Sequence, residues 1–243
     1  MQRVESSYAF EKLAAISNTS TKVVELEGYT LNAPEHPLEE SIIYLALKRL
    51  ADIIISGAAI IILMPLMLIV AILIWLEDRG PIIYYTTRVG QCGKGFRFYK
   101  FRSMYINADD YKFKGDLHRH NEGKGGIFKI KLDPRVTRVG RWIRRLSIDE
   151  LPQLFLVFSG RMSMVGPRPQ GPEEVQSFTP MHSSKLLVKP GLLCLREIRG
   201  RSELTFEQWI SADIEYVMRR SLWLDITIFV MAFPAVLSTR GAY

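Results

Sequence analysis

The segment Ile53–Leu76 reads IIISGAAIIILMPLMLIVAILIWL, and its 24 residues include no charged side chain. A helix of about 20 apolar residues is long enough to span the hydrocarbon core of a bilayer. Burial inside a soluble core is a weak alternative at this length, so the segment predicts a helix that inserts into a membrane. The chain then divides into an N-terminal extension over residues 1–46, a membrane helix over 47–78 and a globular domain over 79–243.

Basic residues flank the apolar segment on both sides: Lys48 and Arg49 precede it and Arg79 follows it. Positive flanks favour the cytoplasmic side of a membrane, and a straight span would satisfy only one of them. Pro65 removes a backbone donor and clashes with the preceding turn, so we expect a bend there, with Ser56 accommodating further distortion. These features favour a re-entrant helix that enters and leaves the same leaflet. A single-pass anchor is the alternative, because the tail before the segment is short.

Positive charge is concentrated after the apolar segment. Residues 79–145 hold 17 basic and 5 acidic side chains, whereas the whole chain has 32 Lys and Arg against 25 Asp and Glu. A local excess of this size implies an anionic partner, which could be nucleic acid, an anionic lipid face or a phosphorylated substrate. The chain has no recognisable helix-turn-helix or RNA-binding signature, so we do not expect it to bind nucleic acid.

Cysteine usage indicates neither a disulfide framework nor a zinc site. The two cysteines, Cys92 and Cys194, have no metal-ligand spacing, and the four histidines are scattered. This composition fits a reduced, cytoplasmic compartment.

The globular part is predicted to be a small, helix-rich α/β domain. Ile82–Thr86 and Phe96–Phe101 have strand character on either side of a glycine-rich turn, which predicts a hairpin. Thr205 and Gln208 have the spacing of a capping box before a helix that runs to about Met218. We also expect a short strand over Lys22–Leu26, helices over Met104–Tyr111 and Val136–Arg145, and a polar loop over Gly115–Gly126.

Leu222–Leu237 is a second apolar stretch, interrupted by Asp225 and Pro234 and too short to span a membrane comfortably. With Trp209 and Trp223 nearby, it suits an amphipathic interfacial helix that lies on lipid headgroups. Packing as a core helix is about equally favoured, and the sequence does not decide between the two.

The stretch Ser147–Gln153, SIDELPQ, carries the adjacent carboxylates Asp149 and Glu150 shortly after Arg144. One explanation is structural: acids in the first turn of a helix favour its dipole, and Glu150 could close a capping box with the serine that opens the stretch. The arginine favours chemistry instead, because a guanidinium binds phosphate oxygens and a carboxylate can attack phosphorus to give an acyl phosphate. Two negative reactants repel each other. A divalent ion such as Mg²⁺, held by these carboxylates and substrate phosphates, is therefore expected to assist.

Further cations could bind phosphate. Lys100 and Arg102 stand at alternate positions of a predicted strand end, and so on one side of it. Arg168 lies between Pro167 and Pro169, whose fixed φ angles orient the guanidinium at little entropic cost. A solvated edge strand and a rigid turn are the structural explanations for these two features. Their combination with a membrane segment favours phosphoryl chemistry at a membrane surface.

With these motifs the chain resembles the bacterial sugar transferases, the monotopic phosphoglycosyl transferases that act on polyprenyl phosphate. The resemblance runs from Lys48 to the C-terminus. The motifs that carry it are Lys48-Arg49 before the Pro65-broken helix, Arg88-Val89-Gly90, KFRSM at 100–104, Asp133-Pro134-Arg135, SIDELPQL at 147–154, GRMSMVGPRP at 160–169, LVKPG at 187–191, GRSELTF at 200–206, SLWLD at 221–225 and RGAY at 240–243.

The resemblance implies transfer of a sugar 1-phosphate from a nucleotide diphosphate sugar, with a UDP-hexose expected, to polyprenyl (undecaprenyl) phosphate, which initiates exopolysaccharide or glycoconjugate synthesis. Asp149 would be the nucleophile that carries the phosphosugar covalently, and Glu150 would assist through the metal or by proton handling. Mg²⁺ is the expected cofactor, bound by Asp149 and Glu150. The substrate phosphates would be gathered by Arg88, Lys100, Arg102, Arg144 and Arg168.

The resemblance also implies a location. Lys48, Arg49, Ser56 and Pro65 would set a re-entrant topology, and residues 79–243 would form the catalytic domain with C-terminal interfacial helices. That domain would contact lipids at the cytoplasmic face of a bacterial inner membrane. With forty-odd residues ahead of Lys48, the chain looks like a compact form of the family. A homo-oligomer is allowed but not specified.

One loop departs from the family pattern. Members commonly read KPG-[IL]-T-G-x-W-Q, whereas this chain reads KPGLLCLRE at 189–197. The alternative to an enzyme is therefore a non-catalytic, membrane-bound relative that binds polyprenyl phosphate or nucleotide sugar without turnover. The retained Asp149 and Glu150 favour the enzyme.

Overall fold

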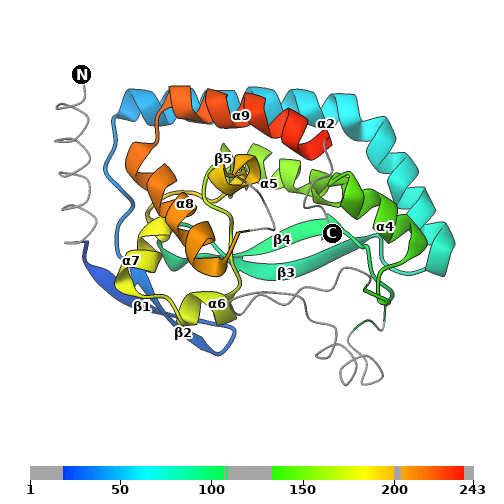
Figure 1. Ribbon diagram of the computed structural model, residues 1–243, viewed down its shortest axis with the longest axis horizontal. Coiled ribbons are helices and arrows are strands. Elements are labelled where there is room, and N and C mark those ends of the chain that lie inside the picture. The colour runs from blue at the N-terminus through cyan, green and yellow to red at the C-terminus, as the bar shows by residue number, and fades with distance from the viewer. Residues whose placement is uncertain (1–18, 107, 109–132, 200–203, 238–243) are drawn as a thin grey trace.

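The computed structural model describes residues 19–106, 108, 133–199 and 204–237, and this part is helix-rich (Figure 1). The strands are β1 (Thr21–Leu26), β2 (Tyr29–Pro34), β3 (Ile83–Val89), β4 (Gly95–Phe101), β5 (Ser163–Val165) and β6 (Gly191–Leu193). The α-helices are α2 (Ile42–Asp78), α4 (Arg138–Arg145), α5 (Leu154–Phe158), α6 (Pro172–Gln176), α7 (Pro180–Ser183), α8 (Phe206–Arg219) and α9 (Leu222–Leu237). Short 3₁₀ helices are η1 (Gln91–Gly93), η3 (Ile148–Gln153), η4 (Ser184–Leu187) and η5 (Leu195–Ile198).

The strands of the described chain form three separate two-stranded sheets. β1–β2 and β3–β4 are antiparallel hairpins, and β5–β6 is a parallel pair. The prediction of a helix-rich α/β domain is therefore confirmed.

α2 contains the whole apolar segment. It is one helix of 37 residues with Pro65 inside it, so the predicted break does not interrupt the helix. Figure 1 shows α2 running along the top of the molecule and turning downward over its C-terminal part, and a bend is the expected effect of an internal proline. Its apolar window is 17% buried, whereas a core helix of a soluble protein is mostly buried. By length and composition α2 can therefore enter a membrane.

The first turns of α2 are fastened to the globular part. Lys48 Nζ lies 2.7 Å from a carboxylate oxygen of Asp225 and donates to the hydroxyl of Tyr216 at 3.2 Å. Both terminal nitrogens of Arg49 donate to main-chain carbonyls at the end of α5, at 2.7 Å. These two cations are thus engaged by protein groups.

Asp52 and Ser56 extend this contact by one turn. Asp52 is buried and accepts hydrogen bonds from Ser163 Oγ at 3.0 Å and from the Met164 N–H at 2.8 Å, both in β5. Ser56 is also buried, and its hydroxyl donates to the Asp52 carbonyl at 2.5 Å. Ser56 therefore bonds within its own helix.

The C-terminal end of α2 is tied down as well. Asp78 accepts from both terminal nitrogens of Arg102, one of them at 2.6 Å. The Glu77 carboxylate accepts the N–H groups of Arg138 at 2.7 Å and Val139 at 3.2 Å, where negative charge is favoured by the dipole of α4. The globular part therefore holds α2 near both of its ends.

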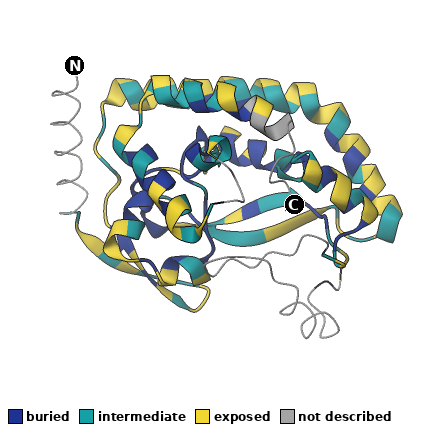
Figure 2. Cartoon of the chain, viewed as in Figure 1, coloured by how far each residue is buried: buried dark blue, intermediate teal, exposed yellow. Residues whose placement is uncertain are grey.

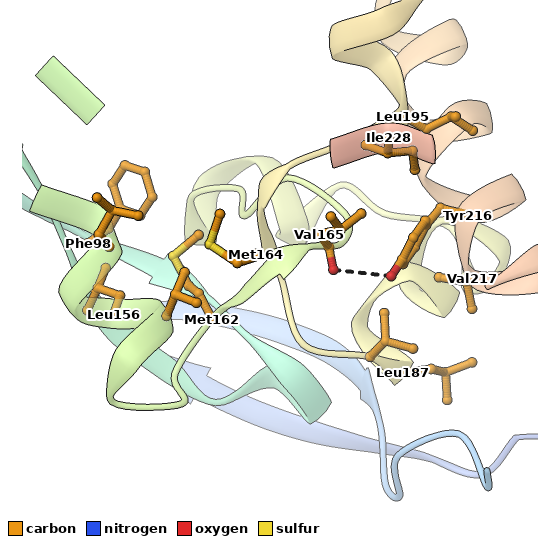
Figure 3. Close-up of a cluster of buried hydrophobic side chains, with 13 residues drawn as sticks. Phe98, Leu156, Met162, Met164, Val165, Leu187, Leu195, Tyr216, Val217 and Ile228 are labelled. Carbon is orange, nitrogen blue, oxygen red and sulfur yellow. Dashed lines mark hydrogen bonds between the residues drawn. The ribbon is translucent and has the colours of Figure 1, made fainter. Parts of the chain in front are cut away.

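The largest hydrophobic core gathers residues of β4, α5, β5, α8 and α9 (Figure 3). Tyr216 of α8 is buried within it and donates its hydroxyl to the Val165 carbonyl at 3.1 Å, the contact drawn dashed in Figure 3. Figure 2 shows buried residues where the elements face one another and many exposed residues along α2.

The hairpin β1–β2 belongs to a second core. Its two-residue turn, Glu27-Gly28, has positive φ at both positions, 51° and 82°, as the tight turn of a twisted hairpin requires. Leu31 and Ala33 are fully buried and cluster with side chains of β3, α6 and α8. The hairpin, which lies inside the predicted extension, thus packs on the globular domain.

Most local predictions are confirmed. β1, the β3–β4 hairpin and α4 lie where they were expected, and α8 begins with the predicted capping box between Thr205 and Gln208. The helix predicted over Met104–Tyr111 is wrong at its start, because Met104 forms an isolated antiparallel bridge with Val136 instead. Tyr105, Ile106 and Ala108 are not helical either, and the rest of that range, residues 107 and 109–111, lies outside the described residues together with the predicted polar loop.

α9 packs on the core along one face, which was one of the two roles considered for Leu222–Leu237. Ile228 and Ala232 are buried against the core, whereas Trp223 and Val230 are exposed. One face of the helix therefore packs on protein and another is exposed, so the interfacial role stays a prediction.

The packing of the hairpin is testable. Leu31→Ala should lower the free energy of unfolding by about 2–5 kcal/mol, because it removes a fully buried side chain and leaves a cavity. Val23→Ala in β1 is the matched control, since Val23 is 65% exposed and its loss should change little. Thermal unfolding in detergent measures both, and equal melting temperatures would contradict the packing.

Candidate active site

The carboxylate pair lies on η3, directly after α4. Ser147 connects the two helices with a left-handed backbone, at φ 54°, and its side chain makes no capping hydrogen bond. The predicted capping box between Ser147 and Glu150 is therefore wrong. The capping box does not form because the turn has 3₁₀ geometry, in which the Glu150 N–H donates to the Ser147 carbonyl at 3.3 Å. The Glu150 side chain is then free to bond another residue.

Glu150 forms an ion pair with Arg168. Arg168 Nη2 lies 2.6 Å from Glu150 Oε1, and Nη1 lies 3.5 Å from Oε2, which is a fork-to-fork arrangement. Burial alone would raise the pKa of Glu150, but the Arg168 guanidinium outweighs it and holds that pKa below its usual range. Glu197 of η5 lies on the same arginine, 3.8 Å from Nη1.

Asp149 behaves in the opposite way. Burial first, and then the neighbouring negative charge of Glu150, raise its pKa to about 6, against the lowering effect of Lys100, Arg144 and Arg168. Among the described residues, none donates a hydrogen bond to the Asp149 carboxylate. Asp149 is therefore the carboxylate whose oxygens are open to a reaction partner, and it is ionised above about pH 6.

Lys100 and Arg144 supply positive charge beside Asp149. Lys100 lies on β4, which packs against η3, and its Nζ is 5.1 Å from the centre of the Tyr84 ring. Burial lowers the pKa of Lys100, and the Asp149 charge counteracts this effect. Arg144 occupies the last turn of α4. A carboxylate surrounded in this way can approach an anionic phosphate with less repulsion.

The other two predicted phosphate ligands, Arg102 and Arg88, each bond a carboxylate outside the Asp149–Glu150 pair. Arg102 is buried, and its terminal nitrogens are engaged by Asp78, so this arginine anchors α2 in the described structure. Arg88 of β3 donates to Glu174 of α6 at 3.3 Å, and burial lowers its pKa. Arg88 nevertheless comes close to the carboxylate pair, because it shares a cavity wall with Arg168.

This cavity has a volume of about 240 Å³ and lies beside the Glu150–Arg168 pair. The Arg196 guanidinium lies over the Trp209 ring at 4.5 Å from its centre. The Nε atoms of Arg88 and Arg196 are buried and have no hydrogen-bond partner in the described part of the chain. The cavity is lined by Arg88, Phe98, Arg168, Pro169, Gln170, Glu174, Lys185, Arg196, Trp209 and Asp213.

Several of these lining residues carry no local sequence signal. Trp209 was expected to lie near lipid headgroups beside the apolar stretch 222–237, but the structure places it on the cavity wall, where the Arg196 guanidinium lies over its ring. Arg196 lies in the loop over residues 189–197 that departs from the family pattern. That departure is the only feature of the sequence that points to Arg196 as part of the site. Lys185 and Asp213 form a buried ion pair between η4 and α8, which only the fold brings together.

Asp149 and Glu150 fit Mg²⁺ as two of its ligands, with the remaining ligands coming from outside the protein. In the described ranges, no group of three or more His, Cys, Asp or Glu side chains could hold a metal ion. Mg²⁺ is often bound by one or two carboxylates together with substrate phosphates and water, and Asp149 with Glu150 could supply those carboxylates. Since Arg168 engages both oxygens of Glu150, Asp149 offers the more open oxygens.

An exposed apolar helix fastened to a small domain is compatible with membrane association, and two carboxylates among cations suit a site that binds phosphate. Residues 43–239 match the family model described as bacterial sugar transferase, and the chain belongs to that family.

Relatives of known name support the assignment. The chain is 42% identical over 167 residues, 68% of its length, to the galactosyl transferase CpsE of Streptococcus agalactiae, and 41% identical over 203 residues, 81% of its length, to the undecaprenyl-phosphate galactose phosphotransferase of Salmonella typhimurium. These matches span only 37% and 42% of those two proteins. The exopolysaccharide production protein ExoY of Sinorhizobium fredii is 38% identical over 199 residues, which cover 81% of this chain and 88% of ExoY.

The opposite pKa shifts predict opposite effects on stability. The raised pKa of Asp149 means that its charge destabilises the folded state, so Asp149→Asn should raise the melting temperature at pH 7.5, by about 2–4 °C per kcal/mol gained. The gain should shrink as the pH falls below about 6, where Asp149 takes up a proton in the folded state. Thermal unfolding in detergent at several pH values measures this effect.

Glu150→Gln is the matched control. Its lowered pKa means that the ionised form stabilises the fold, so this substitution should lower the melting temperature at pH 7.5. Shifts of the same sign in both variants would contradict the electrostatic description of the pair.

Proposed function

We propose that the chain transfers a sugar 1-phosphate from a nucleotide diphosphate sugar to polyprenyl phosphate and thereby initiates synthesis of an exopolysaccharide or related glycoconjugate. The observation that carries this proposal is the open carboxylate of Asp149 beside a Glu150 that is held by Arg168. The names of relatives agree with it, since those from Salmonella and from Komagataeibacter xylinus are undecaprenyl-phosphate galactose and glucose phosphotransferases. A UDP-hexose is the donor we expect.

In the proposed mechanism, an Asp149 oxygen attacks the phosphorus that bears the sugar. The bond from that phosphorus to the bridging oxygen breaks, and the nucleoside monophosphate leaves with the electron pair. An oxygen of polyprenyl phosphate then attacks the resulting acyl phosphate, which forms the lipid diphosphate sugar and releases the Asp149 carboxylate. Lys100 and Arg144 reduce the repulsion between the carboxylate and the substrate phosphates.

Glu150 and Arg168 orient this site. The fork-to-fork pair holds the Glu150 carboxylate next to Asp149, and burial together with the negative charge of Glu150 keeps the pKa of Asp149 raised. Mg²⁺, held by Asp149, Glu150 and the substrate phosphates, would neutralise the charge that develops on the leaving phosphate.

The cavity beside Arg168 is the place we propose for the donor. The buried Nε atoms of Arg88 and Arg196 have no hydrogen-bond partner in the described part of the chain, although Arg196 Nε lies 3.6 Å from a carboxylate oxygen of Glu197. They are donors that phosphate or sugar oxygens could satisfy. Since Arg196 belongs to the loop that departs from the family pattern, that loop would influence which donor is accepted.

A re-entrant α2 is the topology we propose, with the domain at the cytoplasmic face of the inner membrane and in contact with its lipids. Support comes from the ties at both ends of the helix: Lys48 to Asp225, and Asp78 to Arg102. A helix of 37 residues is about 55 Å long, which exceeds the thickness of a bilayer core. A straight crossing would therefore separate its two ends by the membrane and break one set of ties.

A transfer assay tests the activity. Purified protein with Mg²⁺ and undecaprenyl phosphate should move radiolabelled sugar phosphate into lipid from one of UDP-galactose, UDP-glucose or UDP-N-acetylgalactosamine. Asp149→Asn should abolish turnover without loss of membrane association, because it removes the nucleophile and leaves α2 intact. Full activity of Asp149→Asn would refute the nucleophile assignment. Folded wild type that transfers nothing from any donor would favour the non-catalytic alternative.

Cysteine labelling tests the topology. Ser41→Cys, at the exposed start of α2, and Gln176→Cys, exposed on α6, should react with an impermeant maleimide from the same face of sealed vesicles. The two native cysteines are buried and should give little background. Labelling from opposite faces would establish a spanning helix. Pro65→Ala should shift part of the Ser41→Cys labelling to the other face if the bend determines re-entry.

A further inference from the structure

Arg168 is held by its main chain as well as by its side chain. Lys185 Nζ donates to the Arg168 carbonyl at 2.9 Å, and the Arg168 N–H donates to Asp213 Oδ1 at 3.4 Å. Lys185 and Asp213 also form an ion pair with each other, and both side chains are only 3% exposed. One buried pair therefore bonds both polar groups of the Arg168 backbone.

The loop around Arg168 is fixed by further contacts. Lys185 Nζ donates to Gln170 Oε1 at 2.5 Å, and the Gln170 carbonyl accepts the Val89 N–H of β3 at 2.9 Å. On the other side, the Pro167 carbonyl accepts the Gly191 N–H of β6 at 2.8 Å. Residues of η4, α8, β3 and β6 therefore all hydrogen-bond to the four-residue loop over residues 167–170. Arg168 is the only charged side chain of this loop.

Stability alone does not account for an ion pair at this position. Removing two charges from water is costly, and well-packed apolar residues often replace a buried ion pair without loss of stability. Apolar side chains could not, however, bond the carbonyl and the N–H of Arg168. The ion pair supplies charge-assisted hydrogen bonds to the main chain of the residue that holds Glu150.

We propose that the Lys185–Asp213 pair positions Arg168 for phosphoryl transfer. By fixing the backbone of Arg168 it directs the guanidinium to Glu150, and so it sets where that carboxylate stands beside Asp149. This inference rests on the proposed function. Lys185 and Asp213 act through Arg168 and are positioning residues.

The test uses the double variant Lys185→Met/Asp213→Asn, which removes both charges and leaves no uncompensated buried ion. If Arg168 loses its position, kcat should fall on the order of 100-fold while the donor KM changes much less, because misplaced groups act on the transition state. In an Arg168→Lys background the same double substitution should cause little further loss of kcat. Both the Arg168→Lys change and the double substitution disrupt the same interaction, that of Arg168 with Glu150. Wild-type kcat, or a full additional loss in that background, would overturn the proposal.

Glu40→Gln is the matched control. It breaks the Arg220–Glu40 ion pair, whose side chains are 6% and 11% exposed and which includes no residue of the Arg168 loop or of the Lys185–Asp213 pair. It should lower the melting temperature but leave kcat near that of the wild type. A comparable fall in kcat would mean that general destabilisation explains the double variant, and would refute a specific positioning role.

Hydrogen exchange provides a readout that does not depend on activity. The peptide over residues 166–171 should exchange faster in the double variant than in the wild type, because the Arg168 carbonyl loses the Lys185 bond and the Arg168 N–H keeps only an uncharged amide oxygen as acceptor at position 213. Exchange of this peptide should not change in Glu40→Gln. Unchanged exchange in the double variant would overturn the positioning of Arg168. A wild type without transferase activity would instead refute the proposed function, and the exchange result would still decide whether the pair holds the loop.

Discussion

The attachment of α2 at both ends is the constraint on which the rest of the structure depends. Lys48 and Asp52 bind its first turns to β5 and α9, and Asp78 binds its last turn to the residue after β4. The same elements then carry the reactive groups, since β4 brings Lys100 to η3 and the chain after β5 leads to Arg168. The apolar helix and the carboxylate pair are therefore parts of one connected framework.

Within the site, two neighbouring carboxylates differ because only one has a partner. Arg168 bonds both oxygens of Glu150 and lowers its pKa, while Asp149 has no hydrogen-bond donor among the described residues and has a raised pKa. A stable pair of two ionised carboxylates would need a cation for each. Here Arg168 hydrogen-bonds Glu150, whereas Lys100 and Arg144 supply charge near Asp149 without a hydrogen bond to it. The divalent ion and substrate proposed above would complete the surroundings of Asp149.

Features that depend on neighbouring residues could be predicted from the sequence, and features that depend on distant ones could not. The capping box at Thr205, the β3–β4 hairpin and the apolar helix follow from short-range rules, and the motif around Asp149 and Glu150 identified the carboxylate pair. The pairing of Arg102 with Asp78 could not be predicted, since alternation along a strand does not reveal which partner stands opposite. The Arg196–Trp209 contact and the Lys185–Asp213 pair likewise join elements that only the fold brings together.

The double attachment of α2 also affects how the protein responds to its lipid surroundings. An ordinary anchoring helix adapts to a thicker or thinner bilayer by changing its tilt, at a modest energetic cost. α2 cannot tilt by itself, because its first and last turns are bonded to the same domain. A change in hydrophobic thickness would therefore move or rotate the whole molecule, and with it the height of Asp149 relative to the headgroup layer.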